Sequence, residues 1–177
     1  MCGICGVVGL TSHESSGPFT RRAAASLSRL RHRGPDEVGQ VTSGSAVLGL
    51  TRLAIRGLQD GTQPMVDEAT GVVAVCNGEI DNHHELRRWL EERGRPVQQK
   101  TDVAVIPGLF LELGEAFASK LVGAFAVAVW DPRTRRLTLA RDRAGERPLF
   151  FASNGSEIIF ATELAALVSQ NRLPASL

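Results

Sequence analysis

The second residue of the chain is a cysteine, and its position would allow it to supply both a nucleophile and a base. Removal of Met1 would leave Cys2 with a thiol and a free α-amine, whose unperturbed pKa values are about 8.5 and about 7.7–8.0. The amine is then partly unprotonated near neutral pH and can take the proton of the thiol in the same residue. Because residue 2 is small, removal of Met1 is expected. The alternative, that a cysteine at position 2 is there by chance, stays open at this point.

Cys2 and Cys5 also form a Cys-x-x-Cys spacing, which occurs in thioredoxin-like redox pairs and in zinc sites. A redox pair normally follows a strand and opens a helix, whereas this one begins an expected strand that continues through Val7 and Val8. The sequence has one other cysteine, Cys76, and no further pair of cysteines or histidines that would complete four zinc ligands. We therefore expect no metal site, and we expect Cys5 to be a small buried residue.

A second candidate feature is Asn77-Gly78, which directly follows an expected strand at 72–76. A thiolate that attacks an amide creates a tetrahedral oxyanion, which needs hydrogen-bond donors already in place. The side-chain amide of Asn77 and the backbone N–H of Gly78 are donors of this kind, and glycine lets a backbone approach closely. Asn-Gly is also typical of a hairpin turn, and that alternative stays open at this point.

Two charged residues could bind the charges of a free amino acid. Arg52 stands among apolar residues at the end of an expected strand, 46–50, and could hold a carboxylate with two nitrogens. An arginine on the surface of an edge strand is the alternative. Asp102 stands at an expected helix start and could bind an ammonium group, or it could be a plain N-cap. The charged turns at 33–36 and 141–148 are more typical of structural roles.

Apolar periodicity predicts short strands interspersed with helices. Strands are expected at 4–10, 46–50, 72–76, 124–130, 137–141, 149–152 and 158–161. Helices are expected at 19–33, 82–93 (with Asn82 as a side-chain cap), 102–113 and 163–169. The strand segments are almost continuously apolar, which indicates sheets that are buried on both faces. The pattern predicts one layered α+β domain over 1–177 rather than an alternating βαβ fold.

Composition and charge exclude several classes of function. The chain has 177 residues, is 43% hydrophobic and carries a net charge of +1, which gives no electrostatic case for nucleic-acid binding. No apolar run reaches the roughly 18 residues that would span a bilayer, and no basic-apolar signal peptide opens the chain. Three cysteines do not make a disulfide framework. We expect a cytoplasmic protein without nucleic-acid or membrane partners.

Taken together, these segments resemble the N-terminal glutaminase domain of the glutamine-hydrolysing asparagine synthetase family. That domain is a class II glutamine amidotransferase with the N-terminal-nucleophile hydrolase fold. The motifs that carry the resemblance occur in order along nearly the whole chain: Met1 to Ile4, residues 31–36, residues 52–55, residues 77–80, Thr101-Asp102, residues 123–126 with 130–131, and residues 141–149. The resemblance implies a four-layer αββα sandwich.

The resemblance also implies a role for each matching residue. Cys2 would be the nucleophile, with its α-amine as the base, and Asn77 and Gly78 would form the oxyanion hole. The substrate-binding residues would be Arg52 for the α-carboxylate, Glu79 and Asp102 for the α-ammonium group, and Leu53 and Ile55 as further contacts. These roles agree with the chemistry argued above for the residues that were singled out.

The reaction implied by the resemblance is hydrolysis of L-glutamine to glutamate and ammonia through a γ-glutamyl thioester on Cys2. The ammonia would pass to an ATP-dependent synthetase domain or subunit, which would amidate aspartate or a related carboxylate. No nucleotide-binding loop of such a synthetase occurs in the sequence. We therefore expect ATP and Mg²⁺ only on that partner and no cofactor in this domain, which would be either an excised domain or a free-standing subunit. An exposed apolar patch formed by 121–129 and 148–151 is expected to face the partner.

Two other functions are compatible with these features. A catalytically silent scaffold would keep the fold and pack against a synthetase, but it would have no need to retain Cys2 and the oxyanion-hole residues. An acylase with an N-terminal nucleophile would act on other amides. Such an acylase would have no reason to keep both Arg52 and Asp102 for the two charges of an α-amino acid.

Overall fold

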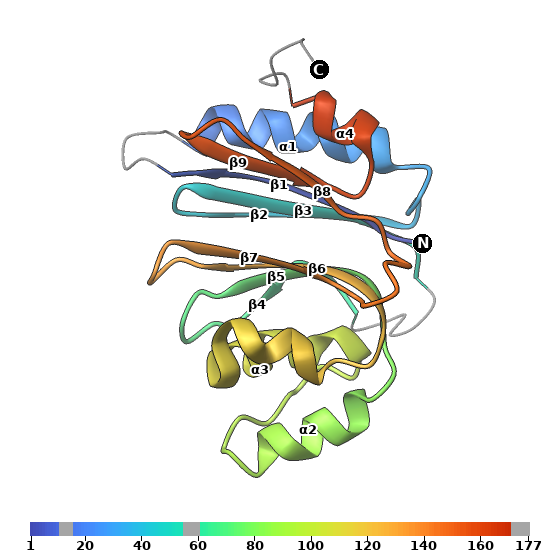
Figure 1. The fold of residues 1–177 in the computed structure, drawn as a ribbon, viewed down its shortest axis with the longest axis vertical. Coiled ribbons are helices and arrows are strands. Elements are labelled where there is room, and N and C mark those ends of the chain that lie inside the picture. The colour runs from blue at the N-terminus through green and yellow to red at the C-terminus, as the bar shows by residue number, and fades with distance from the viewer. Residues whose placement is uncertain (11–15, 55–60, 171–177) are drawn as a thin grey trace.

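In a computed structural model the chain forms two stacked sheets, each covered on its outer face by helices (Figure 1). The structure describes residues 1–10, 16–54 and 61–170. Helices α1 (Ser16–Leu30) and α4 (Leu164–Val168) cover one sheet, and α2 (His83–Glu91) and α3 (Val105–Leu113) lie below the other. Two 3₁₀ helices, η1 (Asp102–Ala104) and η2 (Gly114–Lys120), flank α3. This arrangement confirms the predicted αββα sandwich.

Both sheets are antiparallel. The first has the strand order β2-β3-β1-β9-β8 and the second has the order β4-β5-β6-β7. The strands are β1 (Gly3–Gly9), β2 (Glu37–Ser43), β3 (Ala46–Arg52), β4 (Met65–Val66), β5 (Val73–Ile80), β6 (Gly123–Asp131), β7 (Arg136–Arg141), β8 (Phe150–Ser153) and β9 (Glu157–Ala161). The N-terminus lies at one end of the sandwich, beside the space between the sheets (Figure 1).

Side chains of the central strands alternate between two packing interfaces. In β5, Val73 and Val75 pack between the two sheets, whereas Ala74 and Cys76 pack against the layer of α2 and α3. The same alternation of period two holds in β1, β3 and β6. Both faces of these strands are therefore buried, which explains why their sequences are almost continuously apolar.

Two strands, β2 and β4, were not predicted from the sequence. β2 contains only two strongly apolar residues, Val38 and Val41, and lies at the edge of its sheet. It is held by a hairpin to β3, in which Gly44 adopts a φ of +59° in the turn. β4 is only two residues long. Both strands form because a neighbouring strand offers hydrogen-bond partners, and local sequence preference does not reveal this.

β5 continues to Ile80, beyond the predicted end at residue 76. Asn77 pairs with Ala126 and Gly78 with Phe125 in β6, so the hairpin alternative for Asn-Gly is wrong. Gly78 has a φ of +144°, and a Cβ at this position would lie 2.0 Å from the carbonyl oxygen of Ala124. The strand can therefore follow this path only with glycine at position 78.

The helix boundaries differ from the prediction by one to three residues at several ends. α1 ends at Leu30, three residues earlier than expected. Asn82 precedes α2 but makes no side-chain cap. Instead, its amide donates to the carbonyl of Lys120 and accepts from the N–H of Val122, at 2.9 and 3.0 Å. The side chain thus ties the start of α2 to the segment that leads into β6, and this tertiary contact replaces the local cap.

Candidate active site

The register of β1 and β3 brings Cys2 beside Arg52. Ile4 pairs with Leu50 in this antiparallel register, Cys2 lies two residues before Ile4, and Arg52 lies two residues after Leu50. Ile4 and Leu50 both pack between the two sheets. Because side chains alternate along a strand, Cys2 and Arg52 are directed to the same inter-sheet space, at the end of the sandwich.

β5 brings the predicted oxyanion residues to this same end from the opposite sheet. Val73 and Val75 pack between the sheets, and the side chain of Asn77, two residues further along the strand, is directed to the same face. Gly78 and Glu79 continue the strand, paired with β6. The predicted nucleophile and the predicted oxyanion donors therefore come from facing sheets and lie across the inter-sheet space from each other.

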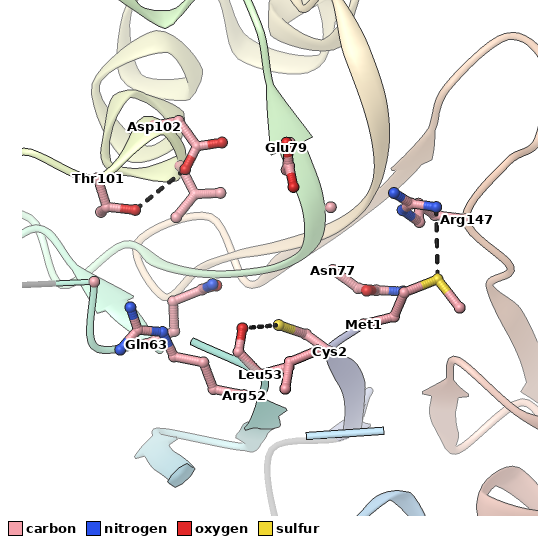
Figure 2. Close-up of a pocket in the computed structure, with 13 residues that line it drawn as sticks. Met1, Cys2, Arg52, Leu53, Gln63, Asn77, Glu79, Thr101, Asp102 and Arg147 are labelled. Carbon is pink, nitrogen blue, oxygen red and sulfur yellow. Dashed lines mark hydrogen bonds between the residues drawn. The ribbon is translucent and has the colours of Figure 1, made fainter. Parts of the chain in front are cut away.

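A pocket that encloses about 550 Å³, part of it open to solvent, lies at this end of the sandwich (Figure 2). Its lining residues are Met1, Cys2, Arg52, Leu53, Gly61, Gln63, Asn77, Gly78, Glu79, Thr101, Asp102, Val103 and Arg147. The structure thus brings together every predicted site residue except Ile55, which lies outside the described residues.

Cys2 is half-buried, and its backbone is anchored. Its Sγ lies 3.8 Å from the carbonyl oxygen of Leu53, as Figure 2 shows. Arg33 donates from Nε to the carbonyl of Cys2 at 3.0 Å, and its Nη1 donates to Glu163 at 2.8 Å. This chain of contacts fixes the residue that precedes β1 while leaving its thiol at the pocket.

The other two thiols differ from Cys2 in burial. Cys5 and Cys76 are fully buried. Burial raises the pKa of the Cys5 thiol to about 12, although a hydrogen bond with Ser26 works in the opposite direction. Burial also raises the pKa of Cys76 well above its ordinary value, and the nearby Asp102 adds to the effect. Since the thiolate is the reactive form, Cys2 is the thiol that is placed to react.

Asn77 is buried without satisfying its amide. The residue is 1% exposed, and neither Nδ2 nor Oδ1 has a hydrogen-bond partner among the residues that the structure describes. Leaving such a group unpaired costs about 1–3 kcal/mol, so buried amides are normally bonded. An unpaired amide that lines a pocket is available to a ligand, which supplies the missing partner.

Arg52 is 6% exposed and lies on a strand with neighbours on both sides, so the alternative of a surface arginine on an edge strand is wrong. Its Nη1 is 3.1 Å from a carboxylate oxygen of Glu37, on the adjacent strand. An ion pair of this kind holds the guanidinium at one side of the pocket, and the five donors of the group can serve more than one acceptor.

The acidic side of the pocket is formed by Asp102 and Glu79. The carboxylate of Asp102 accepts from the N–H of Ile80 at 2.8 Å. It also accepts from the hydroxyl of Thr101 at 3.2 Å (Figure 2). The bond to Ile80 ties η1 to β5, and the N-cap position of η1 is Thr101, so the plain N-cap alternative for Asp102 is wrong. The pocket thus presents a buried cation and two acids to whatever occupies it.

The lining residues that were not identified as site residues from the sequence include Gln63 and Arg147. Gln63 bonds the backbone of Cys76 through both ends of its amide. Arg147 belongs to the turn that was interpreted as structural, and its Nη1 lies 3.6 Å from the sulfur of Met1. Its Nε is buried and has no hydrogen-bond partner within the described part of the chain. The charged turn was the one available signal for Arg147, and no local pattern marks Gln63.

The described residues contain neither a metal-binding cluster nor a helix that could cross a membrane. Over residues 1–10, 16–54 and 61–170, no group of three or more histidines, cysteines, aspartates and glutamates is arranged to hold a metal ion. None of the helices in these ranges is long and apolar enough to cross a membrane.

Comparisons with known proteins agree with this geometry. Residues 1–177 match the family model described as a glutamine amidotransferase domain. The chain is 32% identical over 174 residues to asparagine synthetase (glutamine-hydrolyzing) 2 of Bacillus subtilis, which covers 98% of the chain and 23% of that protein. It is 35% identical over 167 residues to asparagine synthetase B of Escherichia coli, which covers 93% of the chain and 30% of that protein. The chain therefore spans less than a third of the length of these curated relatives.

Solved structures share the fold. The chain superposes on the glutamine phosphoribosylpyrophosphate amidotransferase of B. subtilis, complexed with ADP and GMP, with a TM-score of 0.76 and 23% identity, over 96% of this chain and 43% of that one. A structure described as the allosteric regulatory enzyme of purine biosynthesis gives a TM-score of 0.77 at 22% identity, again over 96% and 43% of the two chains. At these identities the likeness establishes the fold.

Proposed function

Because the chain belongs to the glutamine amidotransferase domain family, as its motifs predicted, we propose that it hydrolyses L-glutamine with Cys2 as the nucleophile. The observation that carries this proposal is the composition of one pocket. A half-buried thiol and an unpaired buried amide face each other there, next to a buried arginine and a buried aspartate. Together these groups supply a nucleophile, an oxyanion donor and partners for both charges of an α-amino acid.

The reaction begins at the mature N-terminus. Once Met1 is removed, the α-amine of Cys2 takes the thiol proton, and the sulfur attacks the side-chain amide carbon of glutamine. The carbonyl oxygen then becomes an oxyanion, which accepts hydrogen bonds from Asn77 Nδ2 and from the N–H of Gly78. The proton passes from the α-amine to the amide nitrogen, the C–N bond breaks and ammonia leaves. A γ-glutamyl thioester remains on Cys2.

Water completes the cycle. The α-amine accepts a proton from a water molecule that attacks the thioester carbon, and the same donors stabilise the second oxyanion. Collapse of this intermediate breaks the C–S bond, releases glutamate and returns the proton to the sulfur. No oxidant, reductant or cofactor enters the proposed sequence.

The substrate is positioned by its two charges. Arg52 binds the α-carboxylate through its planar fork, and Asp102 with Glu79 binds the α-ammonium group. Leu53 lines the same pocket and belongs to this proposal as a further contact, whereas the contact of Ile55, outside the described residues, stays a prediction. A general acylase has no need for this arrangement of charges, and a silent scaffold has no need for the thiol or the unpaired amide. The pocket therefore favours a glutaminase over both alternatives.

We further propose that the ammonia is used by an ATP-dependent synthetase domain or subunit, which holds ATP and Mg²⁺ and amidates aspartate or a related carboxylate. The curated relatives are named as asparagine synthetases and are more than three times as long as the matched region. The three free cysteines are typical of a reducing compartment, so we propose a cytoplasmic location.

The surface offers apolar side chains to such a partner, although not where all of them were expected. Of residues 121–129, only Val122 is a well-exposed apolar residue, since β6 is a central strand whose side chains are buried. Phe150 and Phe151 are 38% and 67% exposed on the edge strand β8. This part of the predicted patch is therefore confirmed as exposed apolar surface, and the part on β6 is wrong.

The experiment that tests the proposed function is covalent labelling of the purified chain. Intact-mass measurement should show loss of Met1, and an electrophilic diazoketone analogue of glutamine should add once, with glutamine protecting against it. Peptide mapping should place the label on Cys2. A Cys5→Ala variant should label as the parent does, whereas Cys2→Ala should not label. Label on Cys5 or Cys76, or no glutamate release by the parent, would overturn the proposal.

A further inference from the structure

Gln63 is the second buried side-chain amide that lines the pocket, and it is bonded in a specific way. It is 5% exposed. Its Oε1 accepts a hydrogen bond from the backbone N–H of Cys76 at 2.7 Å, and its Nε2 donates to the carbonyl of the same residue at 3.2 Å. One side chain thus satisfies both backbone groups of one residue of β5.

This pair of bonds replaces a missing strand. β4 pairs with β5 through Met65 opposite Ala74 and Val66 opposite Val73. The same register continued by two residues would place position 63 opposite Cys76. β4 begins only at Met65, so the side chain of Gln63 makes the bonds that a longer strand would have made with its main chain. Cys76 is therefore held from this edge by Gln63 and from the other by β6, where it pairs with Val127.

Gln63 is itself held against the opposite sheet. Gly39 of β2 packs so closely on the carbonyl of Gln63 that a Cβ at position 39 would lie 1.9 Å from that oxygen. The main chain of Gln63 thus rests on the first sheet while its side chain holds the second. The residue links the two sheets beside the pocket that lies between them.

The position of Asn77 depends on the backbone that carries it. Its amide has no hydrogen bond within the described residues that would orient it, so its location follows from the path of β5. The residue directly before it is Cys76, which Gln63 bonds. We propose that Gln63 is a positioning residue, which fixes β5 at Cys76 so that the donors of Asn77 and Gly78 stand where the oxyanion forms. This inference rests on the proposed function.

The role requires a side chain with both a donor and an acceptor at this length. Methionine has a similar volume but neither donates nor accepts strongly. A glutamate carboxylate accepts from the Cys76 N–H but places a second acceptor against the Cys76 carbonyl. A protonated carboxyl restores a donor at that position. Gln63→Met and Gln63→Glu therefore separate filling of space from hydrogen bonding.

The first test compares kcat, KM and binding of two ligands in the full chain. A misplacement of about 1 Å costs on the order of 10²-fold in rate, so kcat for glutamine should fall about 10–100-fold in both variants. In Gln63→Met, which adds no charge to the pocket, KM should change by less than about threefold, and the two affinities that follow are compared in this variant. The affinity for glutamate γ-semialdehyde, which forms a tetrahedral adduct with the thiol, should fall by the same factor as kcat. The affinity for glutamate should not.

The second test uses pH. In Gln63→Glu the introduced carboxyl regains a donor when it is protonated, so the ratio of variant to parent kcat should rise as pH falls. In Gln63→Met the ratio should stay constant, because that side chain does not titrate. If Gln63 only filled space, the ratio of variant to parent kcat would not change with pH in either variant. If Gln63→Met does not fold, the Gln63→Glu profile decides.

Gln170 provides a matched control. It is also fully buried, and its Nε2 donates to the carbonyl of Phe160 at 3.3 Å, in the other sheet. Gln170→Met should lower Tm without changing kcat of the folded protein. Unchanged kcat in the Gln63 variants, or an equal loss of glutamate binding, would overturn the inference while leaving the proposed function intact. A parent chain that releases no glutamate would instead overturn the proposed function.

Discussion

Two sets of buried polar side chains can be compared: the wall, Asn77, Arg52 and Asp102, which is proposed to meet substrate, and the support, Gln63 and Asp142, which bonds neighbouring backbone. The sharpest difference between them is in the two amides, Asn77 and Gln63, which both line the pocket. On the wall, the amide of Asn77 has no partner among the described residues. In the support, both ends of the Gln63 amide are bonded, and Asp142 accepts three backbone N–H groups. Bonded groups fix geometry, whereas an unbonded group in a pocket is free to bind what enters. The comparison separates the Asn77 amide, which should act on substrate, from the Gln63 amide, which should act on structure.

The largest effect should follow from removing the unbonded amide. Asn77→Ala should lower kcat for glutamine about 10²–10³-fold with little change in KM, because loss of one oxyanion donor removes an interaction made in the transition state. Steady-state assays of glutamate release measure both constants. Asn82→Ala is the control, since that amide bonds the backbone at 120 and 122, and its kcat should stay near the parent value. A raised KM alone would reassign Asn77 to substrate binding.

The next effect concerns Arg52, the buried cation that lines the pocket. Arg52→Ala should raise KM for glutamine about 10–100-fold, because a hydrogen-bonded charge pair contributes about 1.5–3 kcal/mol and the substrate carboxylate would lose its partner. Arg136→Ala removes an exposed ion pair with Glu115 and should leave KM unchanged.

The acidic side of the same pocket is tested by changing the substrate. N-acetylglutamine lacks the ammonium group, so Asp102 would be left without a cation, and the parent should turn this compound over poorly. Turnover of N-acetylglutamine at a rate comparable to glutamine would contradict the assigned roles and favour a general acylase.

The wall of the pocket was largely predictable from the sequence, and the support was not. Cys2, Arg52, Asn77 and Asp102 are side chains with recognisable chemistry at the ends of predicted elements. Their recognition did not depend on knowing which strands are neighbours. The sandwich was also predictable, because strands buried on both faces leave continuous apolar runs.

Features that depend on distant backbone escaped prediction. Gln63 acts on the main chain of Cys76, which leaves no side-chain pattern in the sequence. Asn82 looked like a helix cap, but the backbone of residues 120 and 122 competes for its amide. β2 forms because the backbone of β3 offers it hydrogen-bond partners. In each case tertiary hydrogen bonding decides the structure over local preference.

A smaller effect is expected for the carboxylate of Asp142. Burial tends to raise the pKa of Asp142, but the N–H groups of Glu146, Arg147 and Phe125 outweigh it and hold the pKa below its ordinary value. Asp142→Asn should therefore cost about 1–3 kcal/mol of unfolding free energy at neutral pH, since it replaces a charged acceptor. Denaturant unfolding at several pH values measures this cost.

The pH dependence of that cost has a defined sign. A carboxyl whose pKa is lower in the folded state stabilises the fold above its unfolded pKa of about 3.9. It loses this stabilisation as pH falls through its folded-state pKa. The difference between parent and Asp142→Asn should therefore be constant from pH 7 down to about pH 5 and shrink in stronger acid. Glu115→Gln, in an exposed ion pair, should show almost no difference at any pH. A difference in unfolding free energy that grows as pH falls would contradict the interpretation that the charged Asp142 carboxylate stabilises the fold through its hydrogen bonds.

The smallest effect on the isolated chain should come from its exposed apolar surface, where no polar bonding is at stake. Phe151→Ser, on the edge strand β8, should change the unfolding free energy by no more than about 0.5 kcal/mol and leave kcat and KM for glutamine unchanged. The same variant should weaken binding to the proposed synthetase partner, because exposed aromatic residues are frequent anchors of interfaces. Val38→Ser is the matched control, since Val38 is exposed on β2, the opposite edge of the same sheet. Sedimentation of each variant with the synthetase, together with amidation of the acceptor, measures the effect. Equal binding by both variants would place the partner elsewhere on the surface.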